Sequence, residues 1–267
     1  MFNDTVVWVR GAGELGSAVA HLLHRVGLSV FLSEISPPLA IRRPVTFSDA
    51  ILEGSSEVEG ITGKYTADYV LPVNKPWSYI PVFTDNPEAI WKLKPTILID
   101  ARILKYYEQD YRTWAQLVIG LGPGFNTDQH CHQIIETMRG HELARIIYSG
   151  ESMRDTGIPG VVGGETSRRI IRAPESGRIN WNVNFGDIVP KQQILGTMDN
   201  GQPIRSPLQG MIRGLISPKV DVSTGMKIGD VDPRGGTIKY LQISEKARAV
   251  ACGVLEAIFV HMNQVGK

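Results

Sequence analysis

The spacing of apolar positions predicts an α/β arrangement at the start of the chain. The apolar run Val6–Val9 ends in glycines, and apolar residues then recur every three or four positions between Ala18 and Val26. This spacing indicates a helix. Gly27 ends the helix, and the run Leu28–Leu32 predicts a second strand. The order of strand, glycine turn, helix and strand is typical of a βαβ unit that binds dinucleotides.

The glycines of this turn fit a pyrophosphate-binding role. Gly11 would allow the tight turn, Gly13 the approach of the backbone to the phosphate, and Gly16 the close packing of helix on strand. The free N–H groups at the helix start, which include that of Glu14, favour an anion. Glu34 follows the second predicted strand, where an acid accepts hydrogen bonds from a ribose diol. The alternative is a βαβ unit that serves only as scaffold.

Further apolar runs predict more strands of the same sheet. Tyr79–Phe83, Thr96–Asp100 and Leu117–Gly120 are expected to be strands, Pro87–Leu93 a helix, and residues 141–148 a last strand. Parallel strands bring their carboxyl ends to one edge of a sheet, where open α/β folds bind ligands. The polar and glycine residues that follow these strands are therefore predicted to surround one crevice with the glycine turn. They are Asp100, Arg102, Gly122 and Gly124. The alternative is that the Gly-Pro-Gly stretch is simply a turn.

An internal repeat predicts a second, β-rich region. Ala173–Ile179 is echoed by Ser206–Ile212, and Gly186–Val189 by Val220–Val222. A repeated unit of short apolar runs between glycines and prolines favours β-strands. The pattern resembles the biotinyl/lipoyl-like barrel-sandwich fold, whose carrier members present a lysine on a central hairpin. The corresponding hairpin, Gly196–Gln202, contains no lysine, so we expect neither biotin nor lipoate.

The chain ends in a predicted helix. Ser244 is a suitable N-cap, and Glu245 lies in the first turn, where the helix dipole favours an acid. An apolar stripe follows, so this helix is expected to pack back on the first domain. The predicted fold class is α/β, with a Rossmann-like parallel sheet domain over 1–165, a biotinyl/lipoyl-like β domain over 166–243 and the helix over 244–267.

A polar cluster between residues 130 and 141 holds the candidate catalytic groups. Cys131 lies between two histidines and near a predicted helix start, which are features that lower the pKa of a thiol. The alternative is an unreactive packed cysteine. Arg139 can offer a planar fork to an anion. The spacing matches no standard zinc motif, and no metal site is predicted. The catalytic candidates are Cys131, His132, Glu136 and His141.

Composition narrows the compartment and the partners. The chain of 267 residues has a net charge of +1, so charge gives no reason to expect nucleic acid or anionic membrane as a partner. No apolar run is long enough to cross a bilayer, and no signal-peptide pattern is present. Two cysteines far apart in sequence give no disulfide framework. The expected location is the cytoplasm.

Several motifs together carry a family resemblance. They occur in the order Val9–Gly16, Leu121–Phe125, Ile135–His141, Ala173–Gly177, Lys227–Arg234 and Ile243–Arg248. The chain thereby resembles the accessory proteins of selenium-dependent molybdenum hydroxylases, the YqeB-type family. It is also reminiscent of chaperones that mature xanthine dehydrogenase. The resemblance implies a maturation role with a molybdenum hydroxylase as client.

Three functional hypotheses follow. The first is a maturation factor that binds a nucleotide or molybdopterin dinucleotide in the crevice and handles sulfur or selenium at Cys131. The second is an NAD-dependent oxidoreductase in which His132 or His141 donates a proton. The third is a non-catalytic binding module with a vestigial pocket.

Overall fold

A computed structural model describes residues 5–107, 109–158 and 160–265. The chain divides into two compact units. Unit 1 comprises the described residues of Met1–Ser36, Val45–Thr156 and Ile243–Lys267. Unit 2 comprises those of Pro37–Pro44 and Gly157–Gln242. Each unit has its own apolar core.

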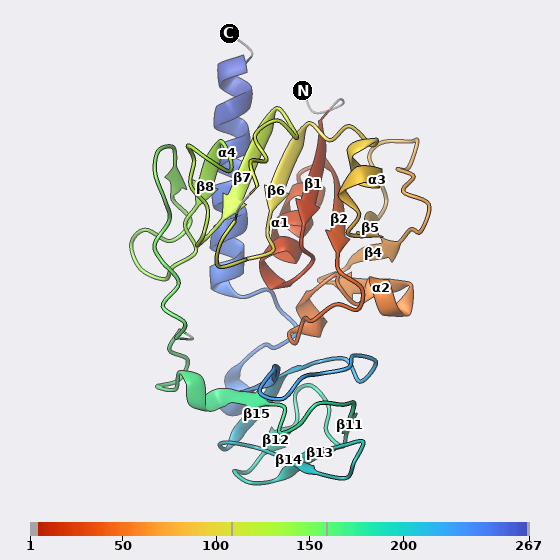
Figure 1. Ribbon diagram of the computed structural model, residues 1–267, viewed down its shortest axis with the longest axis vertical. Coiled ribbons are helices and arrows are strands. Elements are labelled where there is room, and N and C mark those ends of the chain that lie inside the picture. The colour runs from red at the N-terminus through yellow and green to blue at the C-terminus, as the bar shows by residue number, and fades with distance from the viewer. Residues whose placement is uncertain (1–4, 108, 159, 266–267) are drawn as a thin grey trace. The chain divides into compact units, whose positions relative to one another are not determined.

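Unit 1 is built on a mixed sheet that has nine strands in the described residues (Figure 1). The spatial order is β3-β4-β5-β2-β1-β6-β7-β8-β9. Neighbours are parallel, except that β3 pairs with β4 and β9 with β8 in the antiparallel sense. The bounds are β1 Val6–Arg10, β2 Ser29–Glu34, β3 Ser55–Val58, β4 Ile61–Tyr65, β5 Ile80–Thr84, β6 Ile97–Asp100, β7 Leu117–Leu121, β8 Gln133–Ile135 and β9 Ile146–Ile147.

The two faces of this sheet carry different layers. Val7 and Val9 point to a face covered by α1 (Glu14–Arg25) and α4 (Glu245–Val265), which contact each other. Trp8 points to the opposite face, because successive strand residues alternate. That face is covered by the short helix α3 (Pro87–Trp91) and by aromatic residues of the chain between β6 and β7. Another short helix, α2 (Ala50–Glu53), precedes β3.

The prediction of a Rossmann-like parallel sheet domain is therefore wrong. Antiparallel strands form both edges of the sheet, and irregular chain replaces the expected helices where β6 leads to β7 and β7 to β8. The apolar spacing could not reveal this, because the aromatic residues that cover this face lie in loops without periodicity.

Two local predictions also fail in this unit. The helix predicted to start near Cys131 is absent, because strand β8 lies there and its three residues are all buried. The strand expected over 141–148 shrinks to β9, because Ala144 takes a positive φ of 68° in the preceding turn. Between β1 and β2, by contrast, the predicted glycine turn and helix are both present.

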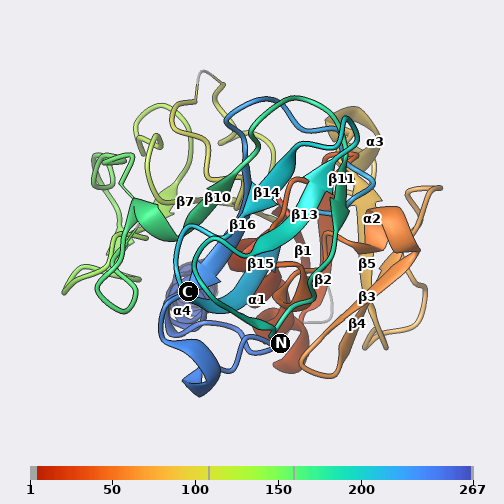
Figure 2. The same ribbon diagram turned by 90° about the horizontal axis from the view of Figure 1, so that it is seen from below.

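Unit 2 contains two separate antiparallel sheets around one core (Figure 2). One has the order β10-β16-β15-β12 and the other β11-β13-β14. The bounds are β10 Ile170–Arg172, β11 Ile179–Trp181, β12 Ile188–Val189, β13 Ile194–Met198, β14 Pro203–Arg205, β15 Gly210–Leu215 and β16 Lys227–Asp232. Short 3-10 helices span Arg43–Val45, Ser167–Arg169 and Gly235–Thr237.

The biotinyl/lipoyl-like barrel-sandwich prediction is corrected as well. No ladder joins the four-stranded to the three-stranded sheet among the described residues. Register shifts interrupt the pairing at Ile171/Arg172, Ile194/Gly196 and Ile212/Gly214. The repeat reflects two similar apolar runs, of which Ile179 and Ile212 both enter the core.

Candidate functional site

The glycine loop, Gly11–Gly16, is held at the carboxyl end of β1 by close backbone contacts. Gly11 has a positive φ of 101°, and a Cβ on Gly16 would lie 1.9 Å from the carbonyl oxygen of Gly11. Ser17 Oγ donates to the Ala12 carbonyl at 2.8 Å, and Ser17 N–H donates to the Gly13 carbonyl at 2.8 Å. These contacts fix the start of α1 against the strand end.

Gly13 differs from the other two glycines. A Cβ placed on it would meet no protein atom within 4 Å. Gly13 is the N-cap of α1, and no side chain caps this end of the helix. The loop therefore exposes a helix N-terminus beside open space, which is a geometry that favours an anion.

Glu34 is tied to the same loop. Its Oε2 accepts a hydrogen bond from Ala12 N–H at 2.7 Å, and its Oε1 accepts one from Ile35 N–H at 2.8 Å. Burial raises the pKa of Glu34, although these two backbone hydrogen bonds oppose the shift. Each carboxylate oxygen can accept a second hydrogen bond, so Glu34 is held in place beside the glycine loop with acceptor capacity to spare.

A second, partly buried carboxylate at this edge was missed by the sequence analysis. Asp85 follows β5 and pairs with Arg10 at the end of β1, where Arg10 Nη2 lies 2.9 Å from Asp85 Oδ2. Ser33 Oγ donates to Asp85 Oδ1 at 2.7 Å, and Trp8 Nε1–H donates to Ser33 Oγ at 2.8 Å. The signal available was an aspartate near the end of a predicted strand, as at Asp100.

The predicted ligand residues Asp100 and Arg102 bind each other instead. Arg102 Nη2 lies 2.6 Å from Asp100 Oδ2, and Asp100 is fully buried. Arg102 also donates to the Tyr111 hydroxyl at 3.0 Å and lies over the rings of Tyr107 and Tyr111. Burial acts to lower the pKa of Arg102, but Asp100 and Tyr111 outweigh it and raise the value. Arg102 therefore neutralises Asp100 without a ligand.

The glycines after β7 and the acid after β8 serve the packing of neighbouring loops. Gly122 and Gly124 have positive φ angles of 71° and 95°, and a Cβ on Gly124 would lie 2.8 Å from the backbone of Lys105. Glu136 Oε1 accepts from two backbone N–H groups at 2.7 Å, and its Oε2 accepts from Met153 N–H at 2.8 Å. Glu136 is thus a buried anchor with few lone pairs left for catalysis.

The sequence analysis also missed Lys246, in the first turn of α4, as a candidate site residue. Burial lowers its pKa, and Arg139 lowers it further, whereas Glu14 and Glu136 oppose the shift. Arg139, which was predicted to bind an anion, instead pairs with Glu245, and its Nη1 lies 2.7 Å from Glu245 Oε1. Lys246 therefore brings a cation into the field of Glu14 at the start of α1.

The structure corrects the prediction that Cys131 is a reactive thiolate in the glycine crevice. Cys131 precedes β8, so it lies toward the amino edge of a sheet whose carboxyl edge carries the glycine loop. Its side chain is fully buried among apolar and aromatic residues. Burial raises the pKa of Cys131 to about 12. The thiol is therefore protonated at neutral pH and lacks the nucleophilicity that sulfur or selenium transfer needs.

The two histidines proposed as proton donors do not gather at the glycine loop. His132 Nδ1 accepts a hydrogen bond from Val118 N–H at 2.9 Å, and burial lowers the pKa of His132. His141 is exposed and lines a groove between α4 and the segment that leads into β9. No observation thus favours the oxidoreductase hypothesis.

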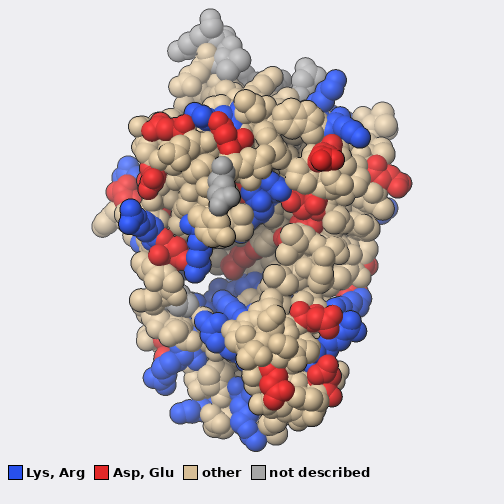
Figure 3. All heavy atoms as spheres, viewed as in Figure 1, with Lys and Arg blue, Asp and Glu red and all other residues tan. Residues whose placement is uncertain are grey.

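Over residues 5–107, 109–158 and 160–265, no group of three or more metal-ligating side chains converges, and no helix is long and apolar enough to span a membrane. On the face drawn in Figure 3, acidic and basic side chains of unit 1 are interspersed.

Comparison with known proteins identifies a homologue that aligns over nearly the whole chain. No protein-family model matches the chain. YqeB of Escherichia coli (strain K12), an uncharacterized protein, is 39% identical over 261 residues, which cover 97% of this chain. The chain is a homologue of YqeB. It spans about half the length of that relative, because the alignment covers 48% of YqeB.

Solved structures align only loosely. An aspartoacylase family protein from Mesorhizobium loti is 9% identical, with 85% of this chain and 84% of that chain covered and a TM-score of 0.28. A succinylglutamate desuccinylase/aspartoacylase from Rhodobacter sphaeroides is 13% identical, with 85% of both chains covered and a TM-score of 0.28. At such TM-scores the likeness carries no conclusion about fold or activity. None of these relatives gives support to the molybdenum and selenium terms of the resemblance.

Proposed function

We propose that unit 1 binds a small phosphate-bearing ligand of the nucleotide type at the glycine loop. The observation that carries this proposal is the open space at Gly13, next to a helix N-terminus that no side chain caps. Backbone atoms occupy the Cβ positions of Gly11 and Gly16, so these two glycines build the loop. The Cβ position of Gly13 is open and leaves room for a ligand. A phosphate placed there would accept hydrogen bonds from the first N–H groups of α1.

Glu34 supports a nucleotide rather than a free phosphate. Its two oxygens are fixed by Ala12 and Ile35, and each retains acceptor capacity for a ribose diol. A carboxylate at this position also disfavours a 2′-phosphate, through like charge. The ligand class is therefore a nucleotide or dinucleotide with free ribose hydroxyls, such as NAD or molybdopterin dinucleotide.

The pathway is proposed from the family resemblance alone. In this proposal the chain is an accessory protein that presents its ligand to a molybdenum hydroxylase client. Its role is binding and delivery, because the buried Cys131 is unsuited to carry sulfur or selenium. A ligand with a pyrophosphate, such as the dinucleotide form of molybdopterin, would suit the glycine loop.

The test is a calorimetric titration of the whole chain with ADP, with NAD and with inorganic pyrophosphate. In the variant Gly13→Leu, the new side chain meets no protein atom at its Cβ but occupies the phosphate position, so binding should fall at least about tenfold. Gly236→Leu is the matched control, since Gly236 of unit 2 also has open space at its Cβ. Unchanged affinity in Gly13→Leu, or no binding of any probe by the wild type, would contradict the proposal.

A further inference from the structure

Strand β9 forms an open edge of the unit 1 sheet. Among the described residues, β8 is its one neighbour. Ile147 is opposite Ile134 and Ile146 is opposite Ile135, while the Arg145 carbonyl accepts from Glu136 N–H at 3.0 Å. Backbone groups alternate in direction along a strand. The N–H and carbonyl groups of Ile146 therefore point away from β8, where they can receive another strand. Continuing β9 by one residue alternation would place those of Tyr148, which follows the strand, on the same side.

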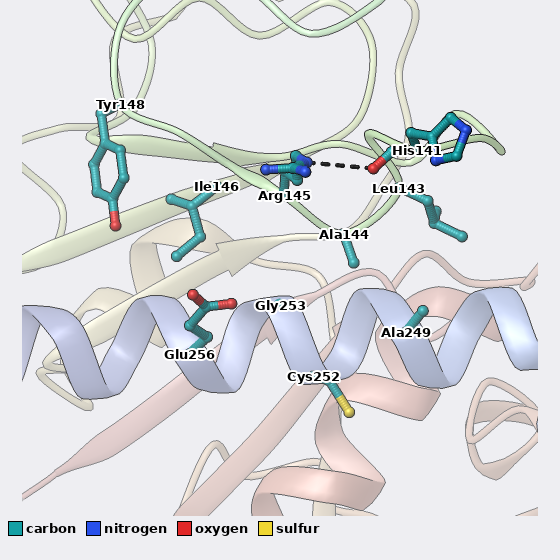
Figure 4. Close-up of a pocket in the computed structure, with 10 residues that line it drawn as sticks. All are labelled: His141, Leu143, Ala144, Arg145, Ile146, Tyr148, Ala249, Cys252, Gly253 and Glu256. Carbon is teal, nitrogen blue, oxygen red and sulfur yellow. Dashed lines mark hydrogen bonds between the residues drawn. The ribbon is translucent and has the colours of Figure 1, made fainter.

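A groove of about 620 Å³ lies directly beside this edge, between the segment 141–148 and α4 (Figure 4). Ala144, Ile146 and Tyr148 are on the side of the segment that faces α4. A Cβ on Gly253 would lie 2.3 Å from the Ala144 carbonyl oxygen, so this glycine brings helix and segment together. The groove has the size of a binding site. Its lining residues are His141, Leu143, Ala144, Arg145, Ile146, Tyr148, Ala249, Cys252, Gly253 and Glu256.

The charges in this β9–α4 groove are unbalanced. The positive charge of Arg145 is already paired, because its Nε lies 3.3 Å from Glu142 Oε2. The same Nε donates to the His141 carbonyl at 3.3 Å. Glu256 rises from α4 toward Ile146 and has no ion pair or hydrogen bond within the described part of the chain. The groove therefore presents one negative charge next to apolar wall.

We propose that the β9 edge and this groove bind an extended peptide segment of another protein by strand addition. Hydrogen bonds to the outward backbone groups of Ile146 and Tyr148 would align the peptide. Side chains two residues apart on the peptide would both enter the groove. One is apolar and packs beside Ile146, and the next is lysine or arginine and meets Glu256.

Charge favours a foreign segment over a second copy of this chain. In a symmetric dimer through two β9 edges, each Glu256 would face the β9–α4 groove surface of the other copy. The cation of that surface, Arg145, is already paired with Glu142. A cationic peptide supplies the missing charge. The inference does not depend on a ligand at the glycine loop.

The first test measures binding of a designed probe. The probe is a short fluorescent peptide of alternating serine and valine with one lysine on the valine face, and its control carries glutamate in place of lysine. Fluorescence anisotropy should show preference for the lysine peptide. Glu256→Gln should weaken that binding by up to about fivefold, as expected for a partly exposed ion pair. Glu256→Lys should reverse the preference, while ADP binding stays unchanged.

The second test addresses the backbone. Tyr148→Pro removes an outward N–H at an edge position, where proline is tolerated, and should reduce binding about fivefold or more. Tyr148→Thr keeps this N–H and the strand propensity, and should bind more tightly than the proline variant. Amide exchange of Ile146 and Tyr148 should slow only when peptide is added.

Three results would overturn the inference. The first is equal binding of the lysine and glutamate peptides in both wild type and Glu256→Lys. The second is no change in exchange at Ile146 and Tyr148 when peptide binds. The third is protection of these two amides without peptide that increases with protein concentration, because this would identify a second copy as the occupant.

Discussion

The close contact between Gly16 and Gly11 predicts that a side chain at position 16 destabilises the fold. In Gly16→Ala the new Cβ would lie 1.9 Å from the Gly11 carbonyl oxygen, whereas ordinary contact begins near 3.4 Å. The obstructing atom belongs to backbone and cannot rotate away. Gly11 itself has little room to retreat, since its own Cβ position lies 2.9 Å from the backbone of Ala101.

The expected change in the free energy of unfolding of Gly16→Ala follows from two opposing effects. Overpacking in a tight site costs about 1–3 kcal/mol, and a rigid backbone obstacle places Gly16→Ala at the upper end of this range. Alanine inside a helix gains about 1 kcal/mol over glycine. We therefore expect the free energy of unfolding to fall by about 2 kcal/mol. Gly13→Ala is the control: its Cβ meets nothing within 4 Å, so it should lose no more than about 1 kcal/mol as a changed N-cap.

The assay is urea unfolding followed by tryptophan fluorescence. Four of the five tryptophans lie in unit 1, so the signal reports mainly on the unit that contains the glycine loop. The midpoint for Gly16→Ala should lie clearly below those of wild type and Gly13→Ala, with the slope unchanged. A Gly16→Ala midpoint equal to that of the wild type would refute the reasoning, because it would mean that α1 does not press on the strand end.

Four further predictions concern the buried polar groups and the two cysteines. Arg102→Leu leaves the fully buried Asp100 without its partner and should cost about 3 kcal/mol in urea unfolding, and adding Asp100→Asn should recover part of that loss; equal stability of the single and double variants would contradict this. Glu136→Gln replaces a carboxylate that accepts three backbone N–H groups and should cost about 2 kcal/mol in the same assay, a result that an unaltered midpoint would exclude. Burial raises the pKa of Cys131 from 9.0 to about 12, so the folded state holds this proton more tightly than the unfolded state. The resulting stability is complete below pH 9 and is lost as pH rises toward 12, which unfolding of wild type and Cys131→Ala as a function of pH can check. A thiol reagent at pH 8 should label the exposed Cys252 of the native chain and spare Cys131, and labelling of both would count against the burial.

Local features were predictable because they depend on residues close in sequence. The apolar run before Gly11, the three-and-four spacing after it and Gly27 at the end place β1, α1 and β2 close to their observed bounds. The stripe after Ser244 predicted a helix where α4 lies. Gly11 and Gly16 could be assigned structural roles because only glycine fits a positive φ or so close a contact.

The partner of each polar side chain was decided by the tertiary structure. Asp100 follows a predicted strand, but only the folded chain shows that Arg102 neutralises it and that Arg10 does the same for Asp85. Cys131 and Glu136 are five positions apart in the sequence, yet β8 runs between them and separates them toward opposite edges of the sheet. A short buried run such as Gln133–Ile135 fits strand or helix equally well, and long-range pairing with β7 decides between them.

The groove beside β9 also exists only in the tertiary structure. Its walls come from residues 141–148 and from α4, which are separated in the sequence by the Gly157–Gln242 part of unit 2. The sequence alone determined that α4 would have an apolar face, since periodicity fixes which residues share a side of a helix. It could not determine that Gly253 meets Ala144 or that Glu256 has no ion pair or hydrogen bond among the described residues, because such contacts depend on how distant segments pack.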